Sequence, residues 1–248
     1  MKKYDPFYYE RLLWEKGIKK IAGADEVGRG SLAGPVVCGV VVLPFFLDTR
    51  INIQRGNKHW EITKESEKYL VNDSKKLTSF QRQKTDGWIK ENAIVWATGE
   101  ASVGEINKSG IVKATCSAFR RAIRTANKNL KSRVQFMLID AFYIPYIAGI
   151  PMGRKFNQKV KGDSVVKGKQ LAIVKGDTKS ISIAAASIIA KVYRDRLMEN
   201  LAISEKNIIY KWEKNKGYGT KEHKEALIQY GPTKHHRKKF ITFISKVF

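Results

Sequence analysis

Four acidic side chains stand at the ends of short apolar segments: Asp25, Glu26, Asp140 and Asp177. In open α/β sheets the functional crevice lies where strands end, so these carboxylates can meet in space although they are far apart in sequence. Four converging carboxylates offer the oxygen ligands that Mg²⁺ or Mn²⁺ prefers, and the lack of clustered Cys and His argues against zinc. Two such ions activate water for phosphodiester hydrolysis, which is the chemistry that this set of residues predicts.

Each acid also has a purely structural interpretation. Asp25 can cap a turn while Glu26 pairs with Arg29 at the surface, and an aspartate at a strand end, such as Asp140 or Asp177, is often a helix N-cap. Against this, burying an ionised carboxylate without a partner is costly, so two acids beside an apolar strand imply a neutralising group such as a metal ion. The sequence leaves both interpretations open.

The charge of the chain indicates a polyanionic partner. Its 248 residues carry 47 Lys and Arg against 23 Asp and Glu, a formal net charge of +24. Nucleic acid is the leading candidate. An anionic membrane surface is the weaker one, because the sequence has no lysine-rich amphipathic helix with an aromatic face.

Neither a membrane span nor an export signal is predicted. The longest apolar run, residues 36–47, is interrupted by Gly39 and Pro44 and is shorter than the roughly 20 residues that a spanning helix needs. The first residues lack an apolar signal core. Cys38 and Cys116 have no metal-ligand spacing, and we expect reduced, buried thiols in a cytoplasmic protein.

The surrounding elements predict an α/β fold that brings the acids together. Apolar or alternating segments predict strands at 21–24, 36–43, 93–101, 133–139 and 171–174, with a turn over 30–35. Helical periodicity and caps predict helices at 5–16, 79–91, 110–129, 181–200 and 221–230, where Thr78 or Ser79 is the N-cap of the second. The alanine-rich helix 181–200 is suited to close packing on the sheet. This order predicts a mixed sheet covered by helices.

Three segments fall outside this alternation. Residues 48–69 are polar and aperiodic, and we expect an irregular insertion with a short helix over 64–70. Residues 153–168 form a loop rich in lysine. From residue 203 onward, Lys and Arg exceed Glu, which predicts a basic helical region.

Several sequence blocks, in order, resemble bacterial ribonuclease HII. They are residues 24–30 with Pro35, Asp73-Ser74-Lys75-Lys76-Leu77, Ile139-Asp140, Lys175-Gly176-Asp177 with 182–192 and 194–196, and Gly217-Tyr218-Gly219-Thr220 with His223. The resemblance covers most of the chain, from about residue 21 to 240.

The resemblance implies a ribonuclease H-like catalytic domain over 1–202 and a basic C-terminal helical region over 203–248. It implies an endoribonuclease that hydrolyses the RNA strand of RNA–DNA hybrids and incises 5′ of single ribonucleotides in duplex DNA, as in ribonucleotide excision repair, leaving 3′-hydroxyl and 5′-phosphate ends. Asp25, Glu26, Asp140 and Asp177 become the catalytic carboxylates that hold two Mg²⁺ or Mn²⁺ ions.

The same resemblance assigns contacts to nucleic acid. Gly28, Arg29 and Gly30 match the motif that senses the ribonucleotide 2′-hydroxyl, where glycines allow close backbone approach. Tyr218 matches the tyrosine that stacks on the next sugar. Phosphate or other nucleic-acid contacts are expected from Ser74, Lys75, Lys175, Ser187 and Lys191. Taken singly, Tyr218 is also compatible with an ordinary turn and each lysine with a solvated charge.

Some features depart from the family pattern. The 48–69 insertion and the 153–168 loop look long, and Lys161-Gly162-Asp163 repeats the Asp177 block; we prefer Asp177 because the alanine-rich helix follows it. An aspartate there also argues against ribonuclease HIII, which resembles this family but uses glutamate. The alternatives are a noncatalytic nucleic-acid-binding protein and a DNA-junction nuclease on the same fold. We expect a monomer without membrane association. The sequence leaves open the preferred metal, the relative activity on long hybrids and single ribonucleotides, any protein partners and the reason for the high charge.

Overall fold

The computed structural model describes residues 5–45, 47, 52–55, 60–64, 67–71, 73–145, 158–160, 164–167, 169–204 and 207–244. A seven-stranded mixed sheet lies at its centre, in the order β6-β2-β1-β7-β10-β9-β8. The strands are β1 (Ile21–Val27), β2 (Val36–Val42), β6 (Val95–Ala101), β7 (Phe136–Asp140), β8 (Gln158–Val160), β9 (Ser164–Lys167) and β10 (Gln170–Ile173). Strand β7 pairs in parallel with β1 on one side and with β10 on the other, and the remaining described pairs of neighbouring strands in this sheet are antiparallel.

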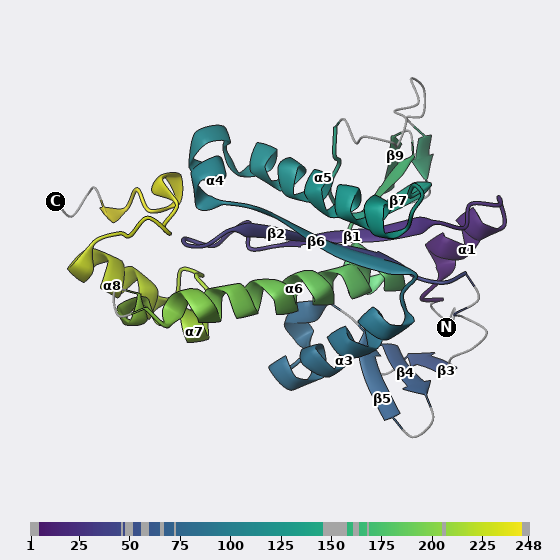
Figure 1. Cartoon of the computed structure of the whole chain (residues 1–248), viewed down its shortest axis with the longest axis horizontal. Coiled ribbons are helices and arrows are strands. Elements are labelled where there is room, and N and C mark those ends of the chain that lie inside the picture. The colour runs from purple at the N-terminus through teal and green to yellow at the C-terminus, as the bar shows by residue number, and fades with distance from the viewer. Residues whose placement is uncertain are drawn as a thin grey trace.

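Helices cover both faces of this sheet (Figure 1). One face packs on α5 (Ile111–Asn129), which contributes Phe119, Ile123 and several alanines to the core, and α4 (Val103–Ser109) adds Ile106. The other face packs on α6 (Ile181–Ala202), which is flanked by α3 (Ser79–Asn92). Because the sheet is covered on both sides, β1 and β2 are buried along almost their whole length.

Two glycines allow α6 to lie directly on the sheet. A Cβ atom on Gly23 of β1 would stand 2.0 Å from the backbone carbon of Ser182, and one on Gly39 of β2 would stand 2.3 Å from the carbonyl oxygen of Ala186. The small side chains of α6 face these glycines, as the sequence predicts. This contact fixes α6 against the strand that carries Asp25.

The amino end of α6 is fixed by the first helix of the chain, α1 (Tyr8–Trp14). The buried carboxylate of Glu10 accepts hydrogen bonds from the Ser180 hydroxyl at 2.6 Å and from the Ser182 backbone N–H at 3.1 Å. Ser180 itself caps the helix by accepting from the Ile183 N–H. A carboxylate at a helix N-terminus is favourable because unpaired N–H groups meet there.

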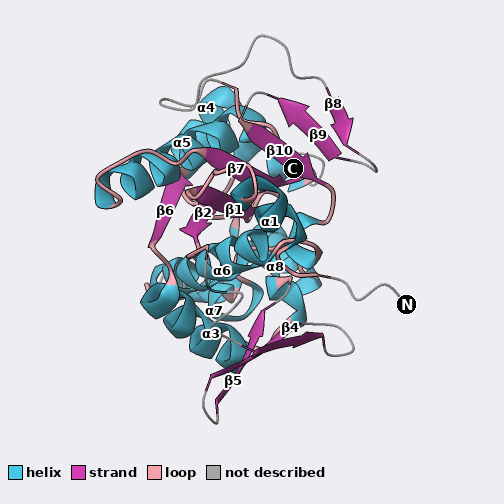
Figure 2. Ribbon diagram, turned by 90° about the vertical axis from the view of Figure 1, so that its right-hand side faces the viewer, coloured by secondary structure: helices cyan, strands magenta, loops and turns pink. Residues whose placement is uncertain are grey.

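The expectation for residues 48–69 is wrong in one respect. The described part of this region forms a second antiparallel sheet of β3 (Asn52–Arg55), β4 (Trp60–Lys64) and β5 (Glu67–Val71), so residues 67–70 of the helix expected over 64–70 lie in a strand. The Tyr69 ring packs against Trp88 of α3, with centroids 5.7 Å apart. Figure 2 shows this small sheet beside α3, away from the central sheet.

Most other expected elements are confirmed, with two adjustments. Thr78 is the N-cap of α3, in a capping box with Gln81. The helical segment after residue 102 is two helices, because Gly110 adopts a φ of 82° and separates α4 from α5. The expected basic loop contains the β8–β9 hairpin, while residues 153–157, 161–163 and 168 lie outside the described part. Cys38 and Cys116 are buried free thiols.

The C-terminal region packs on the far end of α6. Its described part contains α7 (Trp212–Asn215), α8 (Lys221–Tyr230) and two short 3-10 turns, 208–210 and 238–240; another 3-10 turn, 176–178, lies before α6. Its own apolar cluster joins Tyr210, Trp212 and Leu227 to Met198 of α6 and Leu32 of the turn after β1. The boundary at residue 202 remains a prediction. None of the described helices has the length and apolar character that crossing a membrane requires.

Candidate active site

Asp25 and Asp140 lie next to each other on two adjacent interior strands of the central sheet, toward the carboxyl ends of these strands. Strands β1 and β7 are parallel, and Ala24 pairs with Ile139, so the residue after each member of this pair is an aspartate. Asp140 in turn pairs with Ile173 of β10. The three parallel strands therefore deliver their carboxyl ends, and the acids, to the same place, as the sequence predicts.

Asp177 reaches the same place from the 3-10 turn 176–178, directly after β10. The Gly176 backbone N–H donates a hydrogen bond of 2.7 Å to Asp140 Oδ1, which ties the turn to the end of β7. Lys175 and Ala141 adopt left-handed backbone conformations beside the acids, with φ values of 55° and 41°. The cap of α6 is Ser180, so the interpretation of Asp177 as that helix's N-cap is wrong.

Asp25 and Glu26 point to opposite faces of β1, because adjacent residues of a strand alternate. Asp25 is 7% exposed and faces α6, where Ser187 partly offsets the rise of its pKa. Glu26 Oε1 pairs with Arg29 at 3.1 Å, as its structural interpretation predicts, but Glu26 is only partly accessible. Its other oxygen, Oε2, is buried and has no hydrogen-bond partner.

All four carboxyl groups bind protons more tightly than usual. Burial, with the charges of Glu26 and Asp140, raises the pKa of Asp25 well above its ordinary value. Burial also raises the pKa of Glu26, and Arg29 partly offsets this rise. Burial likewise raises the pKa of Asp140, and the hydrogen bond from the Gly176 N–H partly offsets it. Burial and Asp140 raise the pKa of Asp177 to about 6. The carboxyl ends of the parallel strands thus concentrate negative charge, and a bound cation would reduce the repulsion between the carboxylates.

The donor chemistry of this site fits a hard divalent cation. It supplies carboxylate oxygens only, including the unpartnered Glu26 Oε2. Among the described residues, no three Asp, Glu, His or Cys side chains already surround a single point. Asp140 Oδ1 accepts from the Gly176 N–H and Glu26 Oε1 pairs with Arg29, which leaves Glu26 Oε2 without a hydrogen-bond partner.

Asp73 and Lys75 carry charges that interact with the carboxyl groups of the site. Burial lowers the pKa of the Lys75 ammonium, but Asp73, Asp25 and Asp177 together raise it above its ordinary value. Asp73 likewise contributes to the raised pKa of Asp177. Sequence reasoning gave Asp73 no role, although it heads the Asp73-Ser74-Lys75-Lys76-Leu77 block. Its side chain accepts from the Lys75 N–H and so shapes the turn.

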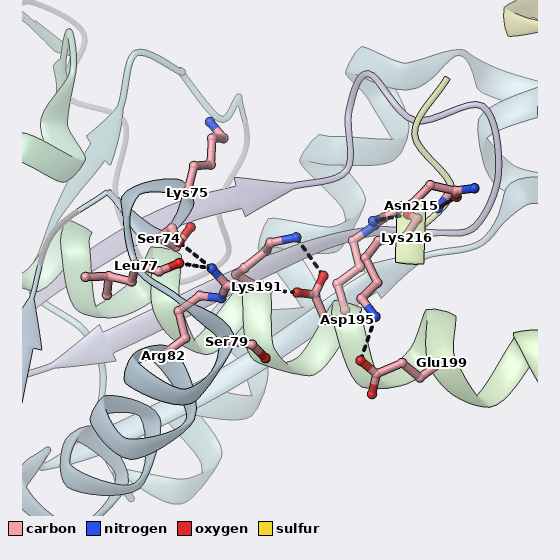
Figure 3. Close-up of polar contacts among 12 residues, drawn as sticks. Ser74, Lys75, Leu77, Ser79, Arg82, Lys191, Asp195, Glu199, Asn215 and Lys216 are labelled. Atoms are coloured by element: carbon pink, nitrogen blue, oxygen red, sulfur yellow. Dashed lines mark hydrogen bonds and ion pairs between the residues drawn. The ribbon is translucent and has the colours of Figure 1, made fainter. Parts of the chain in front are cut away.

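A polar network joins this turn to α6 (Figure 3). Ser74 and Ser187 are both buried, and their hydroxyl oxygens are 2.9 Å apart. Arg82 of α3 donates to the carbonyls of Ser74 and Leu77 and lies 3.7 Å from Asp195. A direct contact between substrate and either serine hydroxyl therefore requires the serine pair to rearrange.

The predicted lysines differ in their surroundings. Lys75 and Lys175 are exposed, and Figure 3 shows Lys75 pointing away from the Arg82 contacts. The Lys191 ammonium is 2.7 Å from Asp195 Oδ1 and 5.8 Å from the centre of the Tyr218 ring. Lys191 is thus held by an acid on its own helix, one turn away.

The turn that contains Gly28, Arg29 and Gly30 is bonded to the loop that contains Tyr218. The Gly217 carbonyl accepts hydrogen bonds from the Leu32 and Ala33 N–H groups at 2.8 and 3.2 Å. Gly28 has a φ of 90°, and a Cβ atom there would stand 2.1 Å from Arg194 Nε, so the turn needs glycine at this position. Gly30 is exposed and has open space around it.

Two buried arginines hold this junction together. Arg194 of α6 donates to the carbonyls of Ala33, Pro35 and Lys216, and its guanidinium carbon is 5.4 Å from the Tyr218 ring centre. Arg237 donates to the carbonyls of Arg29 and Gly34. Burial and Arg194 lower the pKa of Arg237 to about 9. The burial of Arg237 has no signal in the sequence, because a chain rich in lysine and arginine predicts exposed cations.

Comparison with known proteins places this arrangement in a family. The sequence model described as Ribonuclease HII matches residues 22–243. A Ribonuclease HII of Caldanaerobacter subterraneus subsp. tengcongensis is 41% identical over 239 residues, which cover 96% of this chain and 81% of the relative.

Solved structures share the fold. The ribonuclease H2 from Pyrococcus horikoshii OT3 has a TM-score of 0.59 and 25% identity, covering 91% of this chain and 97% of its own. Bst-RNase HIII in complex with Mn²⁺ has a TM-score of 0.56 and 17% identity, covering 92% of this chain and 66% of its own.

The mixed sheet with helices on both faces is therefore a ribonuclease H-like fold, as the sequence blocks predict. The chain belongs to the ribonuclease HII family, and it is a ribonuclease H.

Proposed function

We propose that this protein hydrolyses the RNA strand of RNA–DNA hybrids as an endonuclease. It also incises 5′ of single ribonucleotides embedded in duplex DNA, which is a step of ribonucleotide excision repair. The products carry 3′-hydroxyl and 5′-phosphate ends. The observation that best supports this proposal is the crowding of four carboxyls with raised pKa beside a turn bonded to the Tyr218 loop.

Asp25, Glu26, Asp140 and Asp177 are the residues that would hold two Mg²⁺ or Mn²⁺ ions. Bound divalent ions supply an activated water and stabilise the leaving oxygen of a phosphodiester. The protein contributes the fixed positions of the carboxylates: β1 and β7 carry two of them on adjacent strands, and the Gly176 N–H holds Asp140 in place. Their mutual repulsion disfavours the metal-free charged state, which favours cation binding.

Recognition of the ribonucleotide falls to the neighbouring turn. Gly28, Arg29 and Gly30 approach the 2′-hydroxyl through backbone and guanidinium groups, and Tyr218 stacks on the sugar of the next nucleotide. The hydrogen bonds from Leu32 and Ala33 to Gly217 support this proposal, because they keep the two elements in one relative position. A fixed spacing between them is what discrimination at an RNA–DNA junction requires.

Phosphate groups are contacted by lysines around the site. Lys75 and Lys175 are exposed beside the acids, and Lys191 is near Tyr218. We propose that Ser74 and Ser187 join them when the buried serine pair opens on substrate. Such contacts position the duplex but do not read its sequence.

An incision assay tests the proposal. A labelled DNA duplex with one ribonucleotide is incubated with the protein and Mg²⁺ or Mn²⁺, beside an all-DNA duplex and an all-DNA junction. We expect one cut 5′ of the ribonucleotide and a 3′ end that a DNA polymerase extends. Binding without incision would support a noncatalytic nucleic-acid-binding protein, and cutting of the all-DNA junction would support a junction nuclease.

Three further expectations belong to this proposal. The protein acts in the cytoplasm, it is a monomer, and residues 1–202 and 203–248 form a catalytic domain and a basic helical region. Light scattering coupled to gel filtration tests the monomer.

A further inference from the structure

A buried cluster of aromatic and histidine side chains lies behind Tyr218. Its members are Tyr210, Trp212, His223 and His236, each at most 2% exposed. The two histidine rings face each other, with Nε2 atoms 3.1 Å apart. We call His223 and His236 the histidine pair. Buried polar groups normally have hydrogen-bond partners, and the partners of these two histidines indicate what the pair does.

The hydrogen bonds assign the protons of the histidine pair. The Thr233 backbone N–H donates to His236 Nδ1 at 2.9 Å, so His236 carries its proton on Nε2. That N–H donates to His223 Nε2, which also accepts from the Trp212 indole N–H at 3.1 Å. The His223 proton is therefore on Nδ1, from which it donates to the Tyr218 carbonyl at 2.9 Å. Every ring nitrogen has a partner in only this arrangement.

A second proton on either ring would face a donor already present. Burial lowers the pKa of His223, and burial with the charge of His223 lowers the pKa of His236 to about 3. The charge of His235 also lowers the pKa of His236. The histidine pair is thus a fixed set of neutral donors and acceptors near neutral pH.

The histidine pair lies between the two elements of the proposed recognition site. On one side, the Tyr218 carbonyl is held by His223 and by the Thr220 N–H at 2.9 Å, while the Tyr218 N–H donates to Asn215. On the other side, the backbone around His236 is bridged to the turn that follows Gly30: the Gly34 N–H donates to the His235 carbonyl at 2.9 Å, and the Arg237 N–H donates to the Leu32 carbonyl at 2.8 Å. The side chains of the histidine pair therefore connect Tyr218 to a backbone segment that is itself bonded to the turn.

We propose that His223 and His236 are positioning residues that orient Tyr218 relative to the 28–34 turn, and through it set the discrimination between ribonucleotide and deoxyribonucleotide. This inference rests on the proposed function, in which Tyr218 contacts the substrate sugar. Neither histidine touches substrate. Their action is to fix the Tyr218 backbone, so that the ring meets the sugar without first being ordered.

Two substitutions of one residue separate the roles of its two nitrogens. In His223→Asn the side-chain amide takes the place of Nδ1 and keeps a donor for the Tyr218 carbonyl. In His223→Gln the amide takes the place of Nε2, which keeps the contacts with Trp212 and His236 but removes that donor. His235→Gln is the matched control, because His235 packs on Trp212 at 5.9 Å without a hydrogen bond to Tyr218.

The readout is kcat/KM on a duplex with one ribonucleotide, measured in the full-length protein with Mg²⁺. Loss of one oriented hydrogen bond predicts a decrease of about fivefold to tenfold for His223→Gln, and less than about twofold for His223→Asn and His235→Gln. The same substitutions are then made in a Tyr218→Ala background. If the histidine acts through Tyr218, His223→Gln has no further effect there.

The outcomes distinguish the inference from its basis. If Tyr218→Ala leaves cleavage unchanged, the assignment of Tyr218 in the proposed function fails. If Tyr218→Ala lowers cleavage and His223→Gln lowers it by the same factor in both backgrounds, the inference alone is wrong. Equal losses for His223→Gln and His223→Asn also overturn it, since only one of them removes the donor. Should His223→Gln not fold, His223→Asn with wild-type kcat/KM supports the inference, and His223→Asn with a tenfold loss contradicts it.

Discussion

Asp140 accepts a hydrogen bond from the backbone of Gly176, the residue immediately before Asp177. Asp140 at the end of β7 and Asp177 in the 3-10 turn after β10 are thus held together through the main chain and do not depend on side-chain packing alone. Because the donor is a backbone N–H, it remains when a carboxylate at position 140 is replaced by an amide. This makes charge at the site separable from geometry.

Asp140→Asn is expected to abolish metal-dependent cleavage without disrupting the fold. The amide oxygen still accepts from Gly176, while the half-buried negative charge is lost, so the metal-free variant unfolds at the same temperature as wild type or higher. Cleavage should fall at least about 100-fold, as when one preorganised electrostatic group is removed. Addition of Mg²⁺ or Mn²⁺ should raise the unfolding temperature of wild type more than that of the variant; equal shifts would contradict a metal site at Asp140.

Asp25→Asn should separate cleavage from binding. We expect cleavage to be lost while affinity for a hybrid duplex stays close to wild type, because affinity comes mainly from Lys and Arg contacts to phosphate. Fluorescence anisotropy with a labelled hybrid measures the affinity. A loss of affinity as large as the loss of cleavage would show that Asp25 serves the fold or binding instead.

The affinity for a nucleic-acid duplex should fall steeply as the salt concentration rises, because the chain has 47 Lys and Arg and its partner is a polyanion. Lys75→Ala is expected to reduce the slope of log K against log salt by about 1, as for one phosphate contact. Lys128→Ala is the control, because α5 ends near the start of β7, where Asn127 contacts Val134, at the edge opposite Asp140. Anisotropy titrations at several salt concentrations provide the slopes, and equal slopes for Lys75→Ala and wild type would remove Lys75 from the phosphate contacts.

Gly23→Ala tests the contact between β1 and α6. The added methyl would stand 2.0 Å from the Ser182 backbone, so α6 must move, and we expect a loss of at least about 2 kcal/mol in the free energy of unfolding. Gly87→Ala is the matched control. It lies within α3 with nothing within 4 Å, and alanine there should stabilise by about 0.5–1 kcal/mol. Urea unfolding of both variants gives the comparison, and a neutral Gly23→Ala would argue against close packing.

The histidine pair makes stability depend on pH in a stated direction. His223 and His236 have lower pKa values in the folded protein than the ordinary 6.5, and His236 has one of about 3. Below pH 6.5 the unfolded chain therefore binds more protons than the folded protein, and the free energy of unfolding falls as the pH falls. For His236 the loss between pH 7 and pH 5 is on the order of 2 kcal/mol.

Comparison with His236→Asn isolates this contribution from the carboxyl groups, whose raised pKa values act in the opposite direction. Asparagine keeps an acceptor for the Thr233 N–H but does not titrate. The stability difference between wild type and variant should shrink between pH 7 and pH 5 in urea unfolding. A difference that does not change with pH would show that His236 titrates normally in the folded state.

The sequence predicts the acids and their meeting place because strand ends can be recognised locally. Apolar segments ending at Asp25 and Asp140 carry the information for both the sheet and the site. The sequence does not distinguish Ser180 from Asp177 as the N-cap of α6, since both are acceptable cap residues and only the backbone conformation separates them. Which orientation Glu26 adopts also depends on Arg29 and on the alternation of β1.

What the sequence does not predict depends on distant partners. β5 reads as an aperiodic charged segment, and it is a strand because β4 pairs with it and Trp88 covers Tyr69. Arg194 and Arg237 are buried because carbonyl groups of the 29–35 turn and the Lys216 carbonyl accept their hydrogen bonds. A sequence pattern does not show which carbonyl groups will accept these hydrogen bonds. The burial of the two arginines and the contact within the histidine pair are therefore visible only in the folded structure.

The cap that Glu10 places on α6 also bears on how the chain folds. Glu10 and Ser180 are 170 residues apart, and the bond between them closes the same layer in which α6 covers β1. Strand β1 leaves the ribosome long before α6 is synthesised, so the surface around Gly23, which α6 later covers, stays open to solvent during most of synthesis. Contacts of such high contact order form late and slow folding, and an exposed apolar strand invites aggregation while it waits. The nuclease site should therefore be among the last parts of the protein to form.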